Sequence, residues 1–326
     1  MKIIISTHSR LIEAEVNLED SLLSSSRVVA AGHHYALDHF SDQSLLVKGG
    51  KGELLTFYKY EGGELSDERA IGLDSRFKHV HQAMVSGDSI ILTNTKFNEL
   101  SVLDMNGDIR GQLHLGGLVE DINHVNSLFS LSESSFIALL HNHSRLTRSE
   151  LVFFEITENQ KIKTGRHLKL WHGGCHNITV DGDYLYYNAS ADGVFVVCDL
   201  TKGEIIKELH FPKLHTKGLS LTKDRILVGA SESVAREQRK ASKGEIVSID
   251  RSTFEVVSRT DISVDGEQCG NINEIRVLSE SDDALRLAGD ISPNADRWRL
   301  SESSKFENLK FNLKGKARRL KDRYFR

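Results

Sequence analysis

The stretch HNITVDGDYLYYNASADGVFVVCDLTKGEIIKELHF, residues His176–Phe211, contains the pattern on which the fold depends. It begins with polar residues and a short apolar run, turns at Gly182-Asp183, and continues in a second run that ends at Asn188. A third run ends at Asp199, and a hairpin leads into a fourth. Short apolar runs separated by turns that contain glycine and aspartate are typical of antiparallel strands, so the stretch predicts one four-stranded sheet.

The same pattern recurs along the chain. HQAMVSGDSIILTNTKFNELSVLDMNGDIRGQLHL, residues His81–Leu115, repeats it in full, with a second run ending at Asn94 and a third ending at Asp104. A further unit begins at His33, the first half of the pattern recurs from His124 and from His215, and a shortened unit begins at Asn271. Four-stranded units that recur about every 40 to 50 residues are typical of a β-propeller. The sequence therefore predicts an all-β fold, a six-bladed β-propeller.

The last unit has too few strands of its own to form a blade. We expect the N-terminal strand Lys2–Ser6 to complete it and to close the ring, because closure removes the exposed sheet edges. The units indicate one propeller domain, residues 1–294, followed by a basic C-terminal tail, residues 295–326. We expect helix only in short segments near residues 10–25, 231–243 and 310–323.

Composition places the chain among soluble all-β proteins. With 326 residues and 39% hydrophobic residues it is long enough for a large core, and its net charge of −4 gives no basic footprint for nucleic acid. The chain has no apolar run of transmembrane length and no recognisable signal peptide. Three widely spaced cysteines favour a reducing compartment over a disulfide framework. We therefore expect a cytoplasmic protein, and the sequence leaves its oligomeric state open.

Four histidines open successive units, namely His81, His124, His176 and His215. In a propeller the innermost strand of each blade faces one central channel, so side chains at the starts of those strands converge. Imidazoles from neighbouring blades are suitable ligands for a divalent metal ion. The sequence predicts a polar, histidine-rich channel site for one such ion. The pattern His141-Asn142-His143 is a further candidate, because alternate residues of a strand share a face.

Other polar residues near the strand starts complete the predicted site. Lys217 has the charge to stabilise developing negative charge, and Glu274 is the candidate general base or metal ligand. Arg236 lies in the charged insertion at residues 231–243 and would attract an anionic ligand. The candidate substrate-binding amides are Asn94, Asn126 and Asn188.

Three interpretations of these residues stay open: a metal site, a metal-free site for a sugar or another polyhydroxylated ligand, and side chains that only satisfy backbone groups between blades. The first implies a hydrolase, lyase or isomerase that acts on a small polar, anionic or carbohydrate substrate. The alternative function is a non-catalytic propeller that binds a glycan or a protein. The sequence contains no Gly-x-Ser-x-Gly motif, no phosphate-binding loop and no Cys-x-x-Cys pair.

Several segments resemble those of an uncharacterised bacterial family of conserved hypothetical β-propeller proteins, a domain of unknown function. The likeness extends over His79–Leu278 and is carried by TNTKFNELSVLD, CHNITVDGDYLYYNAS and GEIVSIDRSTFEVV. It implies the propeller fold and no particular activity. A looser likeness is to the six-bladed gluconolactonase and senescence-marker propellers, which hold a divalent cation in the channel. That likeness implies cation ligands at Glu274, Asn126 and Asn273, although the Pro-Asn-Gly-Leu run of those proteins is missing here.

Overall fold

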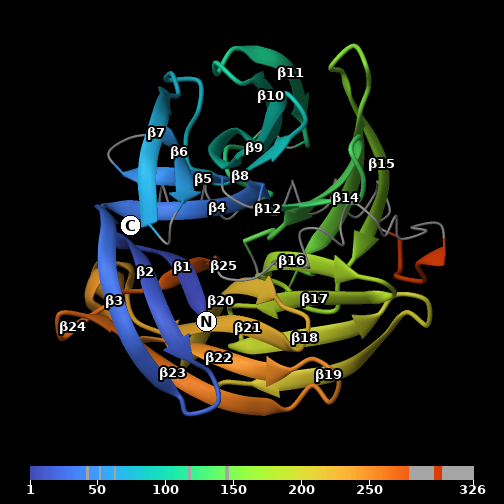
Figure 1. The fold of residues 1–326 in the computed structure, drawn as a ribbon. Coiled ribbons are helices and arrows are strands. Elements are labelled where there is room, and N and C mark those ends of the chain that lie inside the picture. The colour runs from blue at the N-terminus through green and yellow to red at the C-terminus, as the bar shows by residue number, and fades with distance from the viewer. Residues whose placement is uncertain are drawn as a thin grey trace, which may run out of the picture.

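The computed structural model describes residues 1–41, 44–50, 53–61, 64–116, 119–143, 147–278 and 297–302. These residues form six antiparallel sheets, each of four strands except for one of five. The sheets are arranged around a common centre, as Figure 1 shows. The prediction of a six-bladed all-β propeller is therefore confirmed.

Each blade begins with an inner strand beside the channel, and we number the blades in chain order. Blade 1 contains β4 (His33–Ser41), β5 (Ser44–Gly50), β6 (Leu54–Glu61) and β7 (Glu64–Gly72). Blade 2 contains β8 (Val80–Ser86), β9 (Ser89–Asn94), β10 (Glu99–Asp104) and β11 (Ile109–His114). Blade 3 contains β12 (Val125–Ser130), β13 (Ser135–Leu140), β14 (Glu150–Ile156) and β15 (Ile162–Lys169).

The remaining blades follow the same order. Blade 4 contains β16 (His176–Asp181), β17 (Tyr184–Ala189), β18 (Val194–Asp199) and β19 (Glu204–His210). Blade 5 contains β20 (Leu214–Leu221), β21 (Arg225–Glu232), β22 (Gly244–Asp250), β23 (Val256–Val264) and the short β24 (Glu267–Gln268). Blade 6 joins the two ends of the described chain: β25 (Ile272–Val277), β1 (Lys2–Thr7), β2 (Arg10–Asn17) and β3 (Leu22–Ala31).

Blade 6 closes the ring with three N-terminal strands where we expected one. β1 pairs antiparallel with β25, with Ile5 opposite Ile275, and β2 and β3 extend the sheet outward. The helix predicted near residues 10–25 is wrong, because that segment forms β2 and β3. In β2 the side chains of Ala14 and Val16 are buried while that of Glu15 is exposed, which is the alternation of a strand with one buried face.

Helix is limited to two short 3₁₀ segments among the described residues. One of them, η2 (Arg236–Ala241), lies in the predicted segment 231–243, and the other is η1 (Thr95–Phe97). The helix predicted at residues 310–323 falls outside the described residues. No helix in the described part of the chain is long and apolar enough to cross a membrane.

Residues 297–302 pack against blades 3 and 4. Trp298 and Leu300 are buried in the apolar cluster that contains Leu168, and the backbone amide of Lys169 donates a hydrogen bond to the carbonyl of Ser301 at 2.9 Å. This contact adds a short piece of the predicted tail to the propeller surface. The boundary at residue 294 stays a prediction.

The apolar core lies between neighbouring blades. One cluster joins blades 5 and 6 through Ile246, Ile5 and Ile275, and another joins blades 4 and 5 through Phe195 and Val228. Because the outward parts of the blades bury the apolar side chains, the inner strands are free to carry polar residues. The channel is therefore the polar part of the interior.

We expect Ile5→Ala to lower the free energy of unfolding by about 2–5 kcal/mol, since Ile5 is fully buried and the change leaves a cavity beside β25. Leu22→Ala, on β3 of the same blade, is the control, because Leu22 is 58% exposed. Its effect should stay within about 0.5 kcal/mol. Urea unfolding followed by circular dichroism measures both values. Equal effects would contradict the conclusion that the contact between β1 and β25 holds the ring closed.

Candidate functional site

The inner strands bring the four predicted histidines to the same end of the channel. The ring centroids of His81 and His124 are 4.6 Å apart, those of His124 and His176 are 6.4 Å apart, and those of His176 and His215 are 6.0 Å apart. Each ring comes from the start of a different blade, from blade 2 to blade 5. We call this end of the channel the histidine mouth.

Further aromatic side chains extend this row of rings, and among them His33 opens a repeat unit. The ring of Tyr35, on β4, stacks on that of His81 with 4.3 Å between the ring centroids. The centroid of His33 lies 4.1 Å from that of Tyr35, and the centroid of His8 lies 4.2 Å from that of His33. His141 lies 5.0 Å from His124. His8 precedes the repeat units and sits in the β1–β2 turn, so the periodicity of the sequence could not reveal it.

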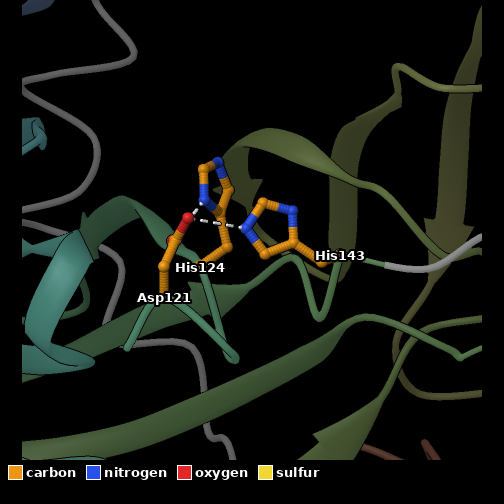
Figure 2. Close-up of side chains that lie close together, drawn as sticks. All are labelled: Asp121, His124 and His143. Carbon is orange, nitrogen blue, oxygen red and sulfur yellow. Dashed lines mark hydrogen bonds and ion pairs between the residues drawn. The ribbon is translucent and has the colours of Figure 1, made fainter. Parts of the chain in front are cut away.

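The compact group of metal-ligating side chains at this mouth consists of Asp121, His124 and His143 (Figure 2). The carboxylate of Asp121 lies between two imidazoles, with one oxygen 2.8 Å from Nδ1 of His124 and the other 3.0 Å from Nε2 of His143. One ligand atom from each of the three residues lies within 4.8 Å of the others. Two imidazoles and one carboxylate form a donor set that suits first-row divalent metals.

This donor set differs from the predicted one. Of the four predicted metal ligands, His124 belongs to it, and His81, His176 and His215 contribute to the surrounding wall. His143 was signalled by the pattern His141-Asn142-His143. Asp121 was missed, because it precedes the strand and approaches the histidines only through the loop between blades 2 and 3.

The backbone around the three residues adopts an uncommon conformation. Asp121, His124 and His143 have φ values of 59°, 47° and 44°, and Asn142 has 59°. Such left-handed conformations cost non-glycine residues of order 1–3 kcal/mol and persist only where the surroundings enforce them. Here the side-chain amide of Asn142 donates to the carbonyl of Arg148 at 3.0 Å, and its backbone amide donates to Asn123. These bonds hold the loop in the shape that directs both histidines at one carboxylate.

Burial and hydrogen bonding set the charges of this group. Burial opposes ionisation of Asp121, but the hydrogen bonds from His124 and His143 outweigh it and hold the pKa of Asp121 below its usual range. Burial lowers the pKa of His124 to about 4, although the neighbouring carboxylate raises it in part. At neutral pH the group therefore contains an ionised carboxylate and a neutral His124 imidazole, the form in which both residues bind metals.

Lys217 is the cation at the centre of the histidine mouth. Its side chain is buried and lines a small cavity of about 20 Å³ together with His81, His176 and Asn273. Its ammonium donates no hydrogen bond to any residue in the described ranges. Burial first, and then the charges of Arg239 and Arg236, lower the pKa of Lys217 to about 7. A buried ammonium without a protein partner is a binding group for an anion.

Glu274 and Asn126 line the same small cavity but are engaged by other protein groups. The carboxylate of Glu274 accepts hydrogen bonds from Asn177 at 2.9 Å and from Arg276 at 2.9 Å. The side-chain amide of Asn126 donates to the carbonyl of Cys175 at 3.0 Å. Asn273, which the gluconolactonase likeness groups with these two, also lines the cavity and donates to the carbonyl of His34. These residues line one cavity, and their hydrogen bonds indicate that they hold the channel wall.

The other predicted residues lie at different distances from the mouth. The amide of Asn94 bonds the backbone of Arg76 and Lys78, so it shapes the loop before β8. Asn188 is fully buried and donates to the carbonyl of Gly218, behind Lys217. Arg236 is exposed on η2, and its charge acts on Lys217.

The cysteines offer no nucleophile to this site. Cys175 adjoins His176, but its thiol is fully buried, and burial raises its pKa to about 12. A thiol with that pKa is almost entirely protonated at neutral pH and is a poor nucleophile. The groups available at the mouth instead include imidazoles, the carboxylates of Asp121 and Glu274, and the amine of Lys217.

No protein-family model and no curated protein matches the chain. Solved structures resemble its fold, three of them as follows. A structure from a nidogen/laminin complex has a TM-score of 0.60 and 10% identity, covering 84% of this chain and 97% of the other. A protein of unknown function from Bacteroides caccae has a TM-score of 0.57 and 14% identity, with coverages of 84% and 97%. The periplasmic gluconolactonase of Pseudomonas aeruginosa has a TM-score of 0.56 and 12% identity, with coverages of 84% and 98%.

At these identities the likeness shows the propeller fold alone. The structures include an uncharacterised bacterial protein and a gluconolactonase, the two kinds of protein that the sequence resembles. Membership of the uncharacterised family stays a prediction, since no family model matches. A periplasmic protein is among these structures, so the cytoplasmic location also stays a prediction.

We expect Lys217→Met to stabilise the protein, and more strongly at pH 6 than at pH 10. The pKa of Lys217 is about 7 in the folded protein, against an ordinary value of 10.5 for a lysine in water. Between pH 7 and pH 10.5 the unfolded chain binds more protons than the folded protein does, so the contribution of Lys217 to the free energy of unfolding rises with pH. Below pH 7 the folded protein carries the buried charge and its full destabilising effect, about 1.4 kcal/mol per unit of pKa shift.

Urea unfolding of both proteins at pH 6 and pH 10 measures this difference. Lys223→Met, at an exposed position of the same blade, is the control and should change stability equally at the two pH values. If Lys217→Met raised the free energy of unfolding equally at pH 6 and pH 10, the buried amine would not be desolvated in the folded protein.

Proposed function

We propose that the histidine mouth binds one divalent metal ion through Asp121, His124 and His143. The observation that carries this proposal is the Asp121 carboxylate held between two imidazoles at 2.8 and 3.0 Å, with burial keeping the pKa of His124 near 4. The donor atoms lie close enough together for a single ion. Three protein ligands leave coordination positions open for a substrate.

The groups around this ion suit a small anionic ligand rich in hydroxyl groups. Lys217 supplies a buried ammonium, and Arg236 and Arg239 add positive charge from η2. Burial lowers the pKa of His81, His141 and His176 well below 6.5, so these imidazoles are neutral and offer both hydrogen-bond donors and acceptors. A carboxylate on the ligand would bind Lys217, while its hydroxyl groups would bind the imidazoles.

This arrangement favours a metal-assisted hydrolase, lyase or isomerase that acts on a compound of the sugar-acid class. A divalent ion supplies polarisation of a carbonyl group or activation of water. The protein residues have separate roles: Lys217 binds and stabilises the anionic group, and the neutral imidazoles orient the hydroxyl groups and accept or donate protons at their ring nitrogens. Glu274, through its hydrogen bond to Asn177, holds the channel wall in place.

We expect protein purified without an affinity tag to contain one divalent metal ion per chain, and Asp121→Asn and His143→Ala to lose at least nine tenths of it. His210→Ala is the control, because His210 is exposed on blade 4, and it should keep the metal. Elemental analysis by mass spectrometry after growth with several metal supplies measures the content. Absence of metal under all supplies would overturn the metal site and favour a binding propeller without catalysis.

Binding of an anionic ligand tests Lys217 directly. We expect wild-type protein to bind gluconate more tightly than glucose at pH 6, where Lys217 is protonated, and Lys217→Met to weaken gluconate binding by about 10- to 100-fold, the value of one charge-assisted hydrogen bond. Isothermal titration calorimetry gives these affinities, with Lys223→Met as the matched control. Equal binding of gluconate by wild type and Lys217→Met would contradict the role of the ammonium.

A further inference from the structure

A cavity in the described part of the channel lies at the opposite end from the histidine mouth. Its volume is about 370 Å³, and residues from all six inner strands line it. These include Asp38 of β4, Met84 of β8, Leu128 of β12, Thr179 of β16, Leu221 of β20 and Arg276 of β25. We call this cavity the distal pocket. Its volume is within the range of small-molecule sites in proteins, about 300–1,000 Å³.

The distal pocket is separate from the proposed metal site. On β20, Lys217 belongs to the histidine mouth and Leu221 to the distal pocket, and four residues of strand span about 13 Å. Between the two ends, Glu274 accepts hydrogen bonds from Asn177 and Arg276. This polar layer lies between the two cavities, which share Gln82 in their linings, whereas the three metal-ligating residues do not line the distal pocket.

Asp38 provides an unbalanced buried charge in the distal pocket. Its side chain is 6% exposed, and its Oδ2 accepts a hydrogen bond from the backbone amide of Val85 at 2.7 Å. Its Oδ1 has no hydrogen-bond partner among the described residues. Burial raises the pKa of Asp38 to about 6.

The charge of Arg276 offsets that of Asp38 only in part. Arg276 lines the pocket, but its guanidinium donates to the carboxylate of Glu274 at 2.9 Å and to the carbonyls of Leu219 and Ile275. The Arg276–Glu274 pair has no net charge, so the buried charge that faces the pocket is that of Asp38, and the exposed Glu133 adds a second carboxylate to the lining. Apolar side chains make up much of the remaining wall, among them Met84, Leu128, Phe129 and Leu221.

We propose that the distal pocket binds a small organic amine, with its protonated nitrogen against Oδ1 of Asp38 and its hydrocarbon part against Met84, Leu128 and Leu221. An ammonium supplies the donor and the positive charge that the buried carboxylate lacks. The apolar walls bury the rest of such a ligand. This site is independent of the proposed metal site and of its substrate.

Binding of matched aromatic probes to the full chain tests this site. Phenethylamine, 2-phenylethanol and 3-phenylpropionate have similar size and differ in charge, and benzylamine and tryptamine vary the size of the amine. We expect at least one of the three amines to bind with a Kd below 10 mM, and to bind at least tenfold more tightly than the alcohol and the acid. Ligand-observed NMR titration measures all five. Binding of no amine at 10 mM, or preference for the acid, would overturn the proposal.

Two variants locate the binding site. Asp38→Asn keeps an acceptor for the Val85 amide and removes the charge, so it should fold and weaken amine binding at least tenfold. Thr179→Trp fills the pocket from a half-buried position and should abolish binding of every probe. Asp88→Asn removes an exposed charge just beyond β8 and should leave binding unchanged.

The metal site provides the last control. His143→Ala should bind the amine with wild-type affinity, since His143 lies at the other end of the channel. Amine binding that survives Asp38→Asn and Thr179→Trp would place the amine elsewhere and refute the proposed site. Amine binding that His143→Ala abolishes would likewise refute the independence of the two ends.

Discussion

The pairing of β1 with β25 is the constraint on which the rest of the molecule depends. Ile3, Ile4 and Ile5 stand opposite Val277, Arg276 and Ile275. This ladder fixes the inner strand of blade 6 in a ring of six, and only a closed ring directs six inner strands at one axis. The same register places Glu274 and Arg276 in the channel, where they separate the two cavities. The pairing that closes the ring therefore also positions the residues of the channel.

Desolvation determines the chemistry of the channel. Burial lowers the pKa of Lys217 and of the imidazoles around it, and it raises the pKa of Asp38 at the far end. The charged form of each of these groups is less stable in the folded protein than it would be in water. The apolar clusters between the blades stabilise the fold enough to tolerate them. A metal ion or a charged ligand would relieve this destabilisation, which is the physical reason for a folded protein to retain such groups at the centre of a propeller.

The sequence predicts the ring and its polar channel well, because the repeat of strands is a local pattern. His81, His124, His176 and His215 converge because each opens an inner strand, which the period alone indicates. Asp121 and Asp38 could not be found in that way. Asp121 reaches the histidines through a loop with positive φ values. Asp38 lies in the C-terminal half of β4, where only the three-dimensional structure shows its burial and the cavity beside it. The helix expected at residues 10–25 failed because pairing with β1 outweighs local helix propensity.

The two ends of the channel have opposite electrostatic character. At the histidine mouth Lys217, Arg236 and Arg239 place positive charge around neutral imidazoles, whereas at the distal pocket the buried charge that faces the cavity is the carboxylate of Asp38. The ion pair between Glu274 and Arg276 lies between them and adds no net charge. This electrostatic difference supports the proposed anion at one end and the proposed amine at the other. The closed ring thus places two chemically distinct cavities on a single axis.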